Sequence, residues 1–462
     1  MNEYIAKLIE QQRAFFSQGS TKDISFRISQ LSALKKSILD HHGEIIEALH
    51  SDLHKSEFES YMTEIHSIVA SINHALAYLK QWIQLTKVKT PFIFWPAKSY
   101  ISYEPRGLSI IISPWNYPFA LSFEPLVGAI AAGNCAIIKP SELSVASATV
   151  IKKIIQTAFP SVYIAVVNGD ARVAEELLSY KVDYIFFTGS PAIGKKVMQA
   201  AAHHITPLTL ELGGKNPCII ASDANLDLAA KKVAWAKFLN AGQSCVAPDY
   251  LLIDEKIKEQ FIELLKKYII HFFGDKPEIS PDYGRIINQI HVERLKNLLQ
   301  TGIINYGGII HEQDRYISPT LIDHINLHDP LMQEEIFGPL LPIITYARSA
   351  NAIEIINQQH KPLGIYLFTK SKEFQNMIQQ NTSSGALCIN ELIIQAASNY
   401  LPFGGVGRSG FGRYHGKKSF QTFSNMKTLI KNSSYYDLPF RYPPYGILQQ
   451  WLQKFVHYFD KQ

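Results

Sequence analysis

Apolar residues recur at intervals of three and four near the start of the chain, at Ile24, Ile28, Leu31, Leu34 and Ile38. This spacing places their side chains on one face of a helix, and Asp23, directly before the run, can act as the N-cap. A second periodic stretch covers residues 58–83. The pattern therefore predicts an all-helical start that is about eighty residues long.

The pattern changes between Val88 and Tyr103, where Thr, Phe, Ile, Trp and Tyr become frequent and Pro91 and Pro96 interrupt the segment. These residue types favour the extended strands of a hairpin. A two-stranded hairpin cannot bury its own apolar side chains. We expect this one to pack on another domain or another subunit.

From residue 107 onward, short apolar runs alternate with segments of helical character. The runs cover residues 108–112, 136–138, 163–167 and 184–187, and each is followed by a turn. After residue 245 the alternation continues to about residue 390, with strands expected at 251–253 and 340–344 and a helix at 257–272. Such alternation predicts an α/β fold with parallel sheets covered on both faces, whose ligands bind beyond the carboxyl ends of the strands.

Length and composition narrow the class of protein. The chain has 462 residues, enough for two or three domains, and 47% hydrophobic with 18% charged residues is typical of a soluble globular enzyme. The 45 basic and 40 acidic residues form no basic block, so no nucleic-acid partner is indicated. The longest apolar tract, residues 125–138, is too short and too interrupted by Gly and Asn to span a bilayer.

The four cysteines, Cys135, Cys218, Cys245 and Cys388, lie far apart in the sequence. They show no Cys-x-x-Cys spacing, so neither a disulfide framework nor a zinc site is indicated, and we expect no metal. The N-terminus lacks the apolar core of a signal peptide. We therefore expect a reducing, cytoplasmic setting.

A candidate nucleophile and a candidate base lie between Leu210 and Tyr250. Glu211 stands just before a pair of glycines, and Cys245 lies in a loop of small residues. A free thiol is only a few per cent thiolate at neutral pH, so a working cysteine needs a neighbouring base, a cation or a backbone dipole. Glu211 could be that base, directly or through a water. The alternative is that Cys245 only fills space in the core, as many buried cysteines do.

Two turns that follow predicted strands carry residues suited to a nucleotide. The Gly-x-Gly-x-x-Gly fingerprint is absent, but Gly189 and Gly194 open a helix whose free N–H groups could receive a pyrophosphate; a plain strand-to-helix turn is the alternative. On the other turn, Glu142 would favour NAD by accepting from ribose hydroxyls, whereas Lys139 would tolerate a 2′-phosphate. The simpler alternative there is a helix start with Ser141 as N-cap and Glu142 in the first turn.

Six motifs, in order along the chain, resemble those of the aldehyde dehydrogenase superfamily. They occupy residues 114–119, 139–142, 188–194, 211–215, 242–245 and 335–339, and the resemblance extends from about residue 20 to residue 430. The short N-terminus and the sequences of residues 245–250 and 414–420 are similar to the class 3 and fatty aldehyde branch. One departure is Pro191, where the family more often has Thr; because Pro lacks an N–H, one donor near the pyrophosphate is lost, which puts cofactor affinity in question.

The resemblance implies oxidation of an aldehyde to a carboxylic acid, with NAD or NADP as the cofactor. Cys245 would attack the aldehyde to form a thiohemiacetal, whose anionic oxygen would be stabilised by the Asn116 side chain and the Cys245 backbone N–H. Hydride transfer to the nicotinamide would leave a thioester. Glu211 would then activate the water that hydrolyses this thioester.

The resemblance also implies which residues hold the cofactor. The matching positions are Lys139, Glu142, Gly189, Ser190, Gly194, Glu335 and Phe337. The first two would take the adenosine ribose, the glycine turn the pyrophosphate, and Glu335 the nicotinamide-side ribose. Phe337 would pack the nicotinamide ring in place, with ordinary core packing as the alternative.

By the same resemblance the α/β fold has three parts. A Rossmann-type parallel-sheet NAD(P)-binding domain covers residues 1–79 and 104–209, and an α/β catalytic domain covers 210–390. A small β bridging (oligomerisation) unit joins 80–103 to 391–430, and a tail follows over 431–462. The bridging unit would explain the unburied hairpin and implies a homodimer.

The tail carries apolar residues at helical spacing over residues 447–459, which predicts an amphipathic helix. This helix could pack on its own or a partner subunit, gate a hydrophobic substrate funnel as in the fatty aldehyde branch, or make a peripheral contact with a membrane surface. We expect no membrane span after it. Deletion of residues 446–462 is predicted to change the rate with long-chain aldehydes more than the rate with short ones.

Alternatives for the substrate and for the reaction stay open. Medium- or long-chain aliphatic aldehydes and aromatic aldehydes of the coniferyl type both suit this branch. A coenzyme A-acylating dehydrogenase is a further alternative, although a hydrolytic base such as Glu211 would be superfluous in it. A catalytically silent protein would be expected to lack Cys245, Asn116 or Glu211, and all three are present.

Overall fold

The computed structural model describes residues 2–438, 441–445, 453 and 456–457. The chain divides into a larger unit, which runs to Trp82 and resumes over Pro105–Ser424, and a smaller unit, which consists of Ile83–Glu104 and the chain after Ser424. The helix predicted over residues 447–459 falls almost entirely outside the described residues. None of the helices in the described ranges combines the length and the apolar composition needed to span a bilayer.

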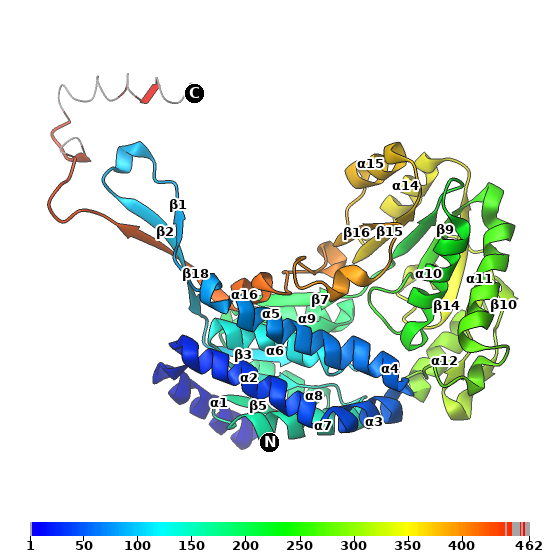
Figure 1. Cartoon of the computed structure of the whole chain (residues 1–462), viewed down its shortest axis with the longest axis horizontal. Helices are drawn as coiled ribbons and strands as arrows, with labels where there is room; N and C mark the ends of the chain where they lie inside the picture. Colours follow the sequence, from blue (N-terminus) through cyan, green and yellow to red (C-terminus); the bar gives the residue numbers. More distant parts are fainter. Residues whose placement is uncertain (1, 439–440, 446–452, 454–455, 458–462) are drawn as a thin grey trace. The chain divides into compact units, whose positions relative to one another are not determined.

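The larger unit begins with helices, as the apolar periodicity predicts (Figure 1). They are α1 (Asn2–Ser17), α2 (Ile24–Asp40), α3 (His42–Leu53), α4 (Glu57–Ser60) and α5 (Ser67–Trp82), with a π-helical segment at Tyr61–His66 between the last two. The predicted cap of α2 is confirmed, because the side chain of Asp23 accepts from the Ser25 N–H at 3.1 Å.

A six-stranded sheet follows, with the strand order β17-β7-β6-β3-β4-β5. Its strands are β3 (Leu108–Ile112), β4 (Cys135–Lys139), β5 (Ile164–Val166), β6 (Tyr184–Gly189), β7 (Leu208–Leu212) and β17 (Gly410–Phe411). The four apolar runs predicted as strands are confirmed as β3 to β6. All neighbours pair in parallel except β17, which is antiparallel to β7.

Helices alternate with these strands and cover the six-stranded sheet. They are α6 (Ala120–Ala132), α7 (Val145–Ala158), α8 (Ala171–Ser179) and α9 (Pro191–His204), and α16 (Lys417–Thr422) packs on α6. Helix α6 packs on β3 and β4, and α9 packs on β6 and β7. The turns after β3, β4 and β6 therefore lie at the carboxyl edge of one parallel sheet, where such sheets bind ligands.

A seven-stranded sheet forms the rest of the larger unit, in the order β10-β13-β14-β9-β8-β15-β16. Its strands are β8 (Pro217–Ile220), β9 (Tyr250–Asp254), β10 (Ile303–Tyr306), β13 (Thr320–Asp323), β14 (Leu340–Tyr346), β15 (Gly364–Phe368) and β16 (Ala386–Ile389). Only β10 pairs antiparallel to its neighbour. The central strands are continuous apolar runs because they are buried on both faces.

Short and long helices accompany this second sheet (Figure 1). They are α10 (Leu226–Phe238), α11 (Lys258–Phe273), α12 (Gln289–Leu298), α13 (Pro330–Gln333), α14 (Ser349–Gln358) and α15 (Lys372–Asn381), and a separate ribbon is formed by β11 (Ile310–His311) and β12 (Tyr316–Ile317). The expected helix at 257–272 is α11, and the strands expected at 251–253 and 340–344 are β9 and β14. These predictions are confirmed.

The smaller unit contains a three-stranded sheet of β1 (Thr86–Val88), β2 (Lys98–Pro105) and β18 (Ser424–Lys431). Strands β1 and β2 pair antiparallel, which confirms the predicted hairpin. On β18, Asn425 and Lys427 each hydrogen-bond to the Glu104 carboxylate at 2.8 Å. Two segments that lie far apart in the sequence, the β1–β2 hairpin and β18, thus form one sheet.

The predicted domain boundaries stay a prediction. Strand β7 crosses the boundary proposed between residues 209 and 210, and it brings Glu211 into the six-stranded sheet. The strands of the seven-stranded sheet all lie between Pro217 and Ile389. The base and the nucleophile therefore come from different sheets of the same unit.

Candidate active site

Cys245 lies in the loop that connects α10 to β9, and its side chain is half-buried. Burial raises the pKa of this thiol, and the carboxyl groups of Glu335 and Glu211 raise it further. The backbone N–H groups of Cys245 and Val246 act in the opposite direction, because both donate to the sulfur. The thiol is therefore protonated at neutral pH in this state and has to lose a proton to a base before it can attack.

Glu211 lies on β7 and is only 4% exposed. Neither of its carboxylate oxygens has a hydrogen-bond partner among the described residues. Burial raises the pKa of Glu211 well above its usual range, with Arg413 as the nearby charge that opposes this shift. A base with a raised pKa can take up a proton near neutral pH.

The loop that carries Gly404 packs closely against Glu211. A Cβ at position 404 would lie 2.9 Å from Glu211 Oε1, and Gly404 has φ +153°. A side chain there would crowd the carboxylate and would also require a backbone conformation that L residues rarely adopt. The glycine therefore keeps space around the candidate base.

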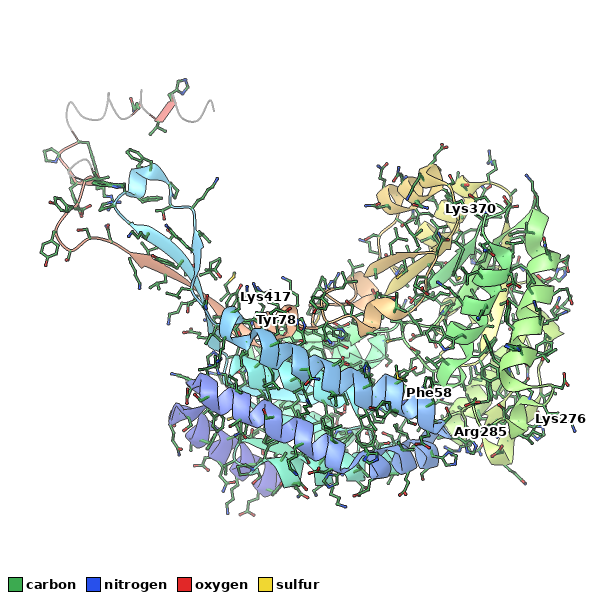
Figure 2. The ribbon with its side chains drawn as sticks, in the orientation of Figure 1. Phe58, Tyr78, Lys276, Arg285, Lys370 and Lys417 are labelled. Carbon is green, nitrogen blue, oxygen red and sulfur yellow. The ribbon has the colours of Figure 1, made fainter. Side chains whose placement is uncertain are left out.

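Asn116 follows β3 and is buried. Its Nδ2 donates to the Gln243 carbonyl oxygen at 3.0 Å, which holds the amide beside the loop of Cys245. Gln243 is itself fixed, because its Nε2 donates to the carbonyl of Arg285 at 2.9 Å and its Oε1 accepts from the Ile287 N–H at 3.0 Å. Arg285 is labelled in Figure 2. Among the described residues, one of the two amide hydrogens of Asn116 has a partner, so the other can face an oxyanion.

Glu335 and Phe337 follow α13. A Cβ at Gly213 would lie 1.8 Å from Glu335 Oε2, so the carboxylate sits directly against the glycine pair that follows Glu211. Burial and the neighbouring Asp249 raise the pKa of Glu335 to about 8. Phe337 meets the ring of Trp115 edge-on, with centroids 5.2 Å apart.

One cavity of about 380 Å³ brings most of the predicted site residues together. Its lining includes Asn116, Glu211, Cys245, Glu335, Phe337, Gly189 and Ser190. Within the described chain, Lys139, Glu142 and Gly194 do not line it. The candidate nucleophile, base, oxyanion donor and nicotinamide-side residues thus share one space.

The turn after β6 has the features of a pyrophosphate site. Ser190 caps α9 by accepting from the Ile193 N–H at 3.4 Å, and Gly194 is buried in the first turn of the helix. Pro191 occupies the first helical position, where an N–H has no partner within the helix, so the helix itself loses no hydrogen bond. In the described part of the chain the buried hydroxyl of Thr188 has no hydrogen-bond partner, which fits a donor reserved for a ligand.

The turn after β4 differs from the simpler alternative, in which Ser141 caps a helix. That alternative is wrong, because α7 begins at Val145 and the Ser141 hydroxyl accepts from the Leu143 N–H at 3.2 Å. Lys139 is buried, and its Nζ lies 2.5 Å from Glu142 Oε2. The two candidate ribose residues therefore form an ion pair with each other.

Residues of α12 line the same cavity and were not predicted from the sequence. His291 has its pKa lowered to about 4 by burial and by the nearby Arg294, so its ring is neutral. Arg294 donates to the Ile336 carbonyl at 2.6 Å and places a cation in the lining. No motif marks these positions, because α12 approaches the site only through the tertiary fold.

Comparison with known proteins gives matches over nearly the whole chain. A model of the aldehyde dehydrogenase family matches residues 2–429. The chain is 47% identical over 444 residues to the 4,4'-diaponeurosporen-aldehyde dehydrogenase of Staphylococcus aureus, with 95% of this chain and 97% of that protein covered. It is 42% identical over 442 residues to a Canis lupus familiaris protein named aldehyde dehydrogenase, dimeric NADP-preferring, with 95% and 98% covered.

A solved structure gives the same result. The substrate-bound state of Staphylococcus aureus AldH has a TM-score of 0.96 to this chain at 45% identity, with 98% of this chain and 99% of that chain covered. The match extends over the larger and the smaller unit alike. The resemblance inferred from six short motifs is confirmed over the full length that it was expected to cover.

Proposed function

Because this chain belongs to the aldehyde dehydrogenase family, we propose that Cys245, Asn116 and Glu211 together oxidise a neutral, apolar aldehyde. Membership makes the protein an NAD(P)-dependent enzyme that converts aldehydes to carboxylic acids. One observation carries the assignment of roles. Within the described residues, a thiol, a carboxylate without a hydrogen-bond partner and an amide with a spare N–H line one cavity.

In the first step, the Cys245 thiol loses its proton to water, and its sulfur forms a bond to the aldehyde carbon. The aldehyde oxygen becomes anionic and accepts hydrogen bonds from Asn116 Nδ2 and the Cys245 backbone N–H. A donor of this kind is worth about 10²–10³ in rate. Two preorganised N–H groups therefore stabilise the negative charge of the thiohemiacetal oxygen as it forms.

A bound nicotinamide would supply the acceptor for the hydride that leaves this carbon, and Cys245 would then carry a thioester. Glu211 takes a proton from a water as that water attacks the thioester carbon. The C–S bond breaks, the acid leaves, and the sulfur recovers a proton. A base with a raised pKa suits this step, because it can hold the proton and return it within one cycle.

In this proposal, the cofactor would be held by three groups of residues. Glu335 takes the nicotinamide-side ribose, and the turn of Thr188 to Gly194 takes the pyrophosphate. Lys139 and Glu142 take the adenosine ribose. Their ion pair supports use of both NAD and NADP, because Glu142 is 40% exposed and can turn away from a 2′-phosphate that Lys139 attracts.

For the substrate we favour medium- or long-chain aliphatic aldehydes. Trp115, Leu121 and Phe337 give the cavity apolar surface, which favours an apolar chain next to the aldehyde group. The Staphylococcus aureus relative, by its name, acts on 4,4'-diaponeurosporen-aldehyde. Aromatic aldehydes stay the second candidate.

A substrate series tests this preference. Reduction of NAD and of NADP is followed with aldehydes from hexanal to hexadecanal, with benzaldehyde, and with succinic semialdehyde as the anionic control. We expect kcat/KM to increase with chain length and to be lowest for the anionic control. A maximum with benzaldehyde would favour the aromatic alternative, and a product that forms only with coenzyme A would favour the acylating one.

We further propose that the protein is a homodimer. The connection between β1 and β2 exposes Phe92, Ile93, Phe94 and Trp95, which are 71%, 38%, 50% and 55% exposed. A cluster of this kind on a small sheet favours contact with another subunit. The relative named dimeric supports the same state. Light scattering should give twice the 52.2 kDa of one chain, and Phe94→Ser with Trp95→Ser should shift the mass towards the monomer.

A further inference from the structure

A buried ion pair lies directly behind the segment that carries Asn116. Lys55 and Glu64 are 1% and 0% exposed, and Lys55 Nζ lies 3.0 Å from Glu64 Oε1. Both residues precede the first strand of the cofactor sheet, and Glu64 belongs to the π-helical segment Tyr61–His66. Taking two charges out of water is costly and is seldom repaid in stability. A contribution to stability therefore does not explain why this ion pair is buried at this place.

The ion pair holds both ends of one short segment. Lys55 Nζ donates to the Asn116 carbonyl oxygen at 3.0 Å. At the other end, Glu64 Oε2 accepts from the N–H groups of Phe119 and Ala120 at 3.1 and 2.8 Å, and Ala120 is the first residue of α6. These N–H groups would otherwise have no partner at the helix start. Residues 116–120 are therefore fixed at their first and last positions by two oppositely charged side chains.

The same cation also reaches towards the loop of the nucleophile. Lys55 Nζ lies 3.9 Å from the centre of the Tyr117 ring, and the Tyr117 hydroxyl hydrogen-bonds to the side chain of Ser244, the neighbour of Cys245. The Asn116 carbonyl accepts a second bond, at 3.0 Å, from Asn240 Nδ2. The oxyanion donor and the nucleophile loop thus share one buried anchor.

We propose that Lys55, paired with Glu64, is a positioning residue that sets the Asn116 amide against Cys245. The inference rests on the role proposed above for Asn116. Lys55 touches the backbone of Asn116 and is not itself among the described residues that line the cavity, so it acts on the reaction through the position of that amide. Its removal is expected to lower kcat and to leave cofactor binding unchanged.

The main experiment compares Lys55→Met with the double variant Lys55→Met/Glu64→Gln. The single variant leaves a buried carboxylate without its partner and should lose stability as well as activity. In the double variant the buried charge is gone, while the Gln oxygen can still accept from the helix start, so Tm should recover. We expect kcat to stay about 10- to 100-fold below that of wild type, which approaches the loss caused by removal of an oxyanion donor. The KM for NADP should stay within about twofold of wild type. Full recovery of kcat in the double variant would overturn the proposal, since Lys55 would then only balance Glu64.

A cycle with Asn116→Ala separates this inference from the role it rests on. If Lys55 acts through Asn116, adding Lys55→Met/Glu64→Gln to Asn116→Ala should cost little further activity, whereas multiplied losses would contradict it. If Asn116→Ala alone keeps full kcat, the oxyanion role itself fails. A matched control is Lys258→Met, which breaks the ion pair of Lys258 with Asp323, at 2.5 Å, away from the site. That variant should lower Tm and leave kcat within about twofold of wild type.

Discussion

The two ends of the candidate site, the chemical end and the ribose end, differ in whether their charged side chains have partners within the protein. At the chemical end, Glu211 is buried with neither oxygen bonded within the described residues, and Glu335 has one oxygen in the same condition. At the ribose end, Lys139 and Glu142 already satisfy each other through an ion pair, and Glu142 is partly exposed. The first end keeps polar groups unsatisfied for the reaction. The second can be altered with little effect on folding.

This contrast has an energetic meaning. A buried polar group without a partner costs stability, so the chemical end weakens the fold for the sake of a function. A partly exposed ion pair contributes little to stability, so the ribose end mainly affects the choice between cofactors. Substitutions at the two ends should therefore differ in the size of their effect and in the property that they change.

The largest effect is expected at the nucleophile. Cys245→Ala should lower the oxidation of every aldehyde by about 10⁴-fold or more, because no other group at this position can carry the acyl intermediate. Steady-state NADPH formation measures it. Cys388→Ala is the matched control, since Cys388 is also a half-buried free cysteine, and it should keep wild-type kcat. Comparable loss in both variants would mean that Cys245 has no special role.

The next effect is on stability and depends on pH. The pKa of Glu335 is raised to about 8 from an ordinary value of 4.5. Between these values the folded protein retains a proton that the unfolded chain has lost, so stability decreases as pH rises through this range. Glu335→Gln removes this decrease. Its Tm should exceed that of wild type by about 3–6 °C at pH 8 and by about 1 °C near pH 5.

The neighbouring Glu334 provides the control for this pH effect. Glu334 is exposed, and its replacement by Gln should leave Tm within about 1 °C of wild type at both pH values. A Glu335→Gln variant whose advantage is equal at pH 5 and pH 8 would show that the carboxyl is not held protonated by the fold.

The smallest effect is expected at the ribose end. Glu142→Ala removes the acceptor for ribose hydroxyls and frees Lys139 for a 2′-phosphate, so the ratio of kcat/KM for NADP to that for NAD should increase about three- to tenfold. Thermal stability should barely change. Glu44→Ala, which breaks an exposed pair with Lys153 at 2.8 Å, is the control and should leave the ratio unaltered. An unchanged ratio in Glu142→Ala would place the adenosine ribose elsewhere.

The sequence predicted the strands well, and its motifs selected residues that the structure brings to one cavity, because both depend on local pattern. Continuous apolar runs mark β3 to β6, and short motifs mark Glu211 and Cys245. The start of α7 was misplaced because its cap comes from far along the chain. Asp52 of α3 accepts from the N–H groups of Ala146 and Ser147 at 3.2 and 2.8 Å, so no local cap is needed.

Other parts of the site escaped prediction for the same reason. His291 and Arg294 reach the cavity from α12, and Lys55 contacts Asn116 across 61 positions of sequence. A buried lysine and a buried glutamate are unusual enough to suggest a partner, but the sequence does not say which groups they meet. Their positions come from packing between elements.

The central claim is that Glu211 serves the hydrolytic step while Cys245 and Asn116 serve the oxidative one. Rapid mixing of Glu211→Gln with NADP and a saturating aldehyde tests it most directly. We predict a burst of one NADPH per site, with the enzyme trapped as a thioester detectable by mass, followed by turnover about 10²–10⁴-fold slower than wild type. A steady rate equal to wild type, or no burst although Cys245 is free and cofactor binds, would contradict the account.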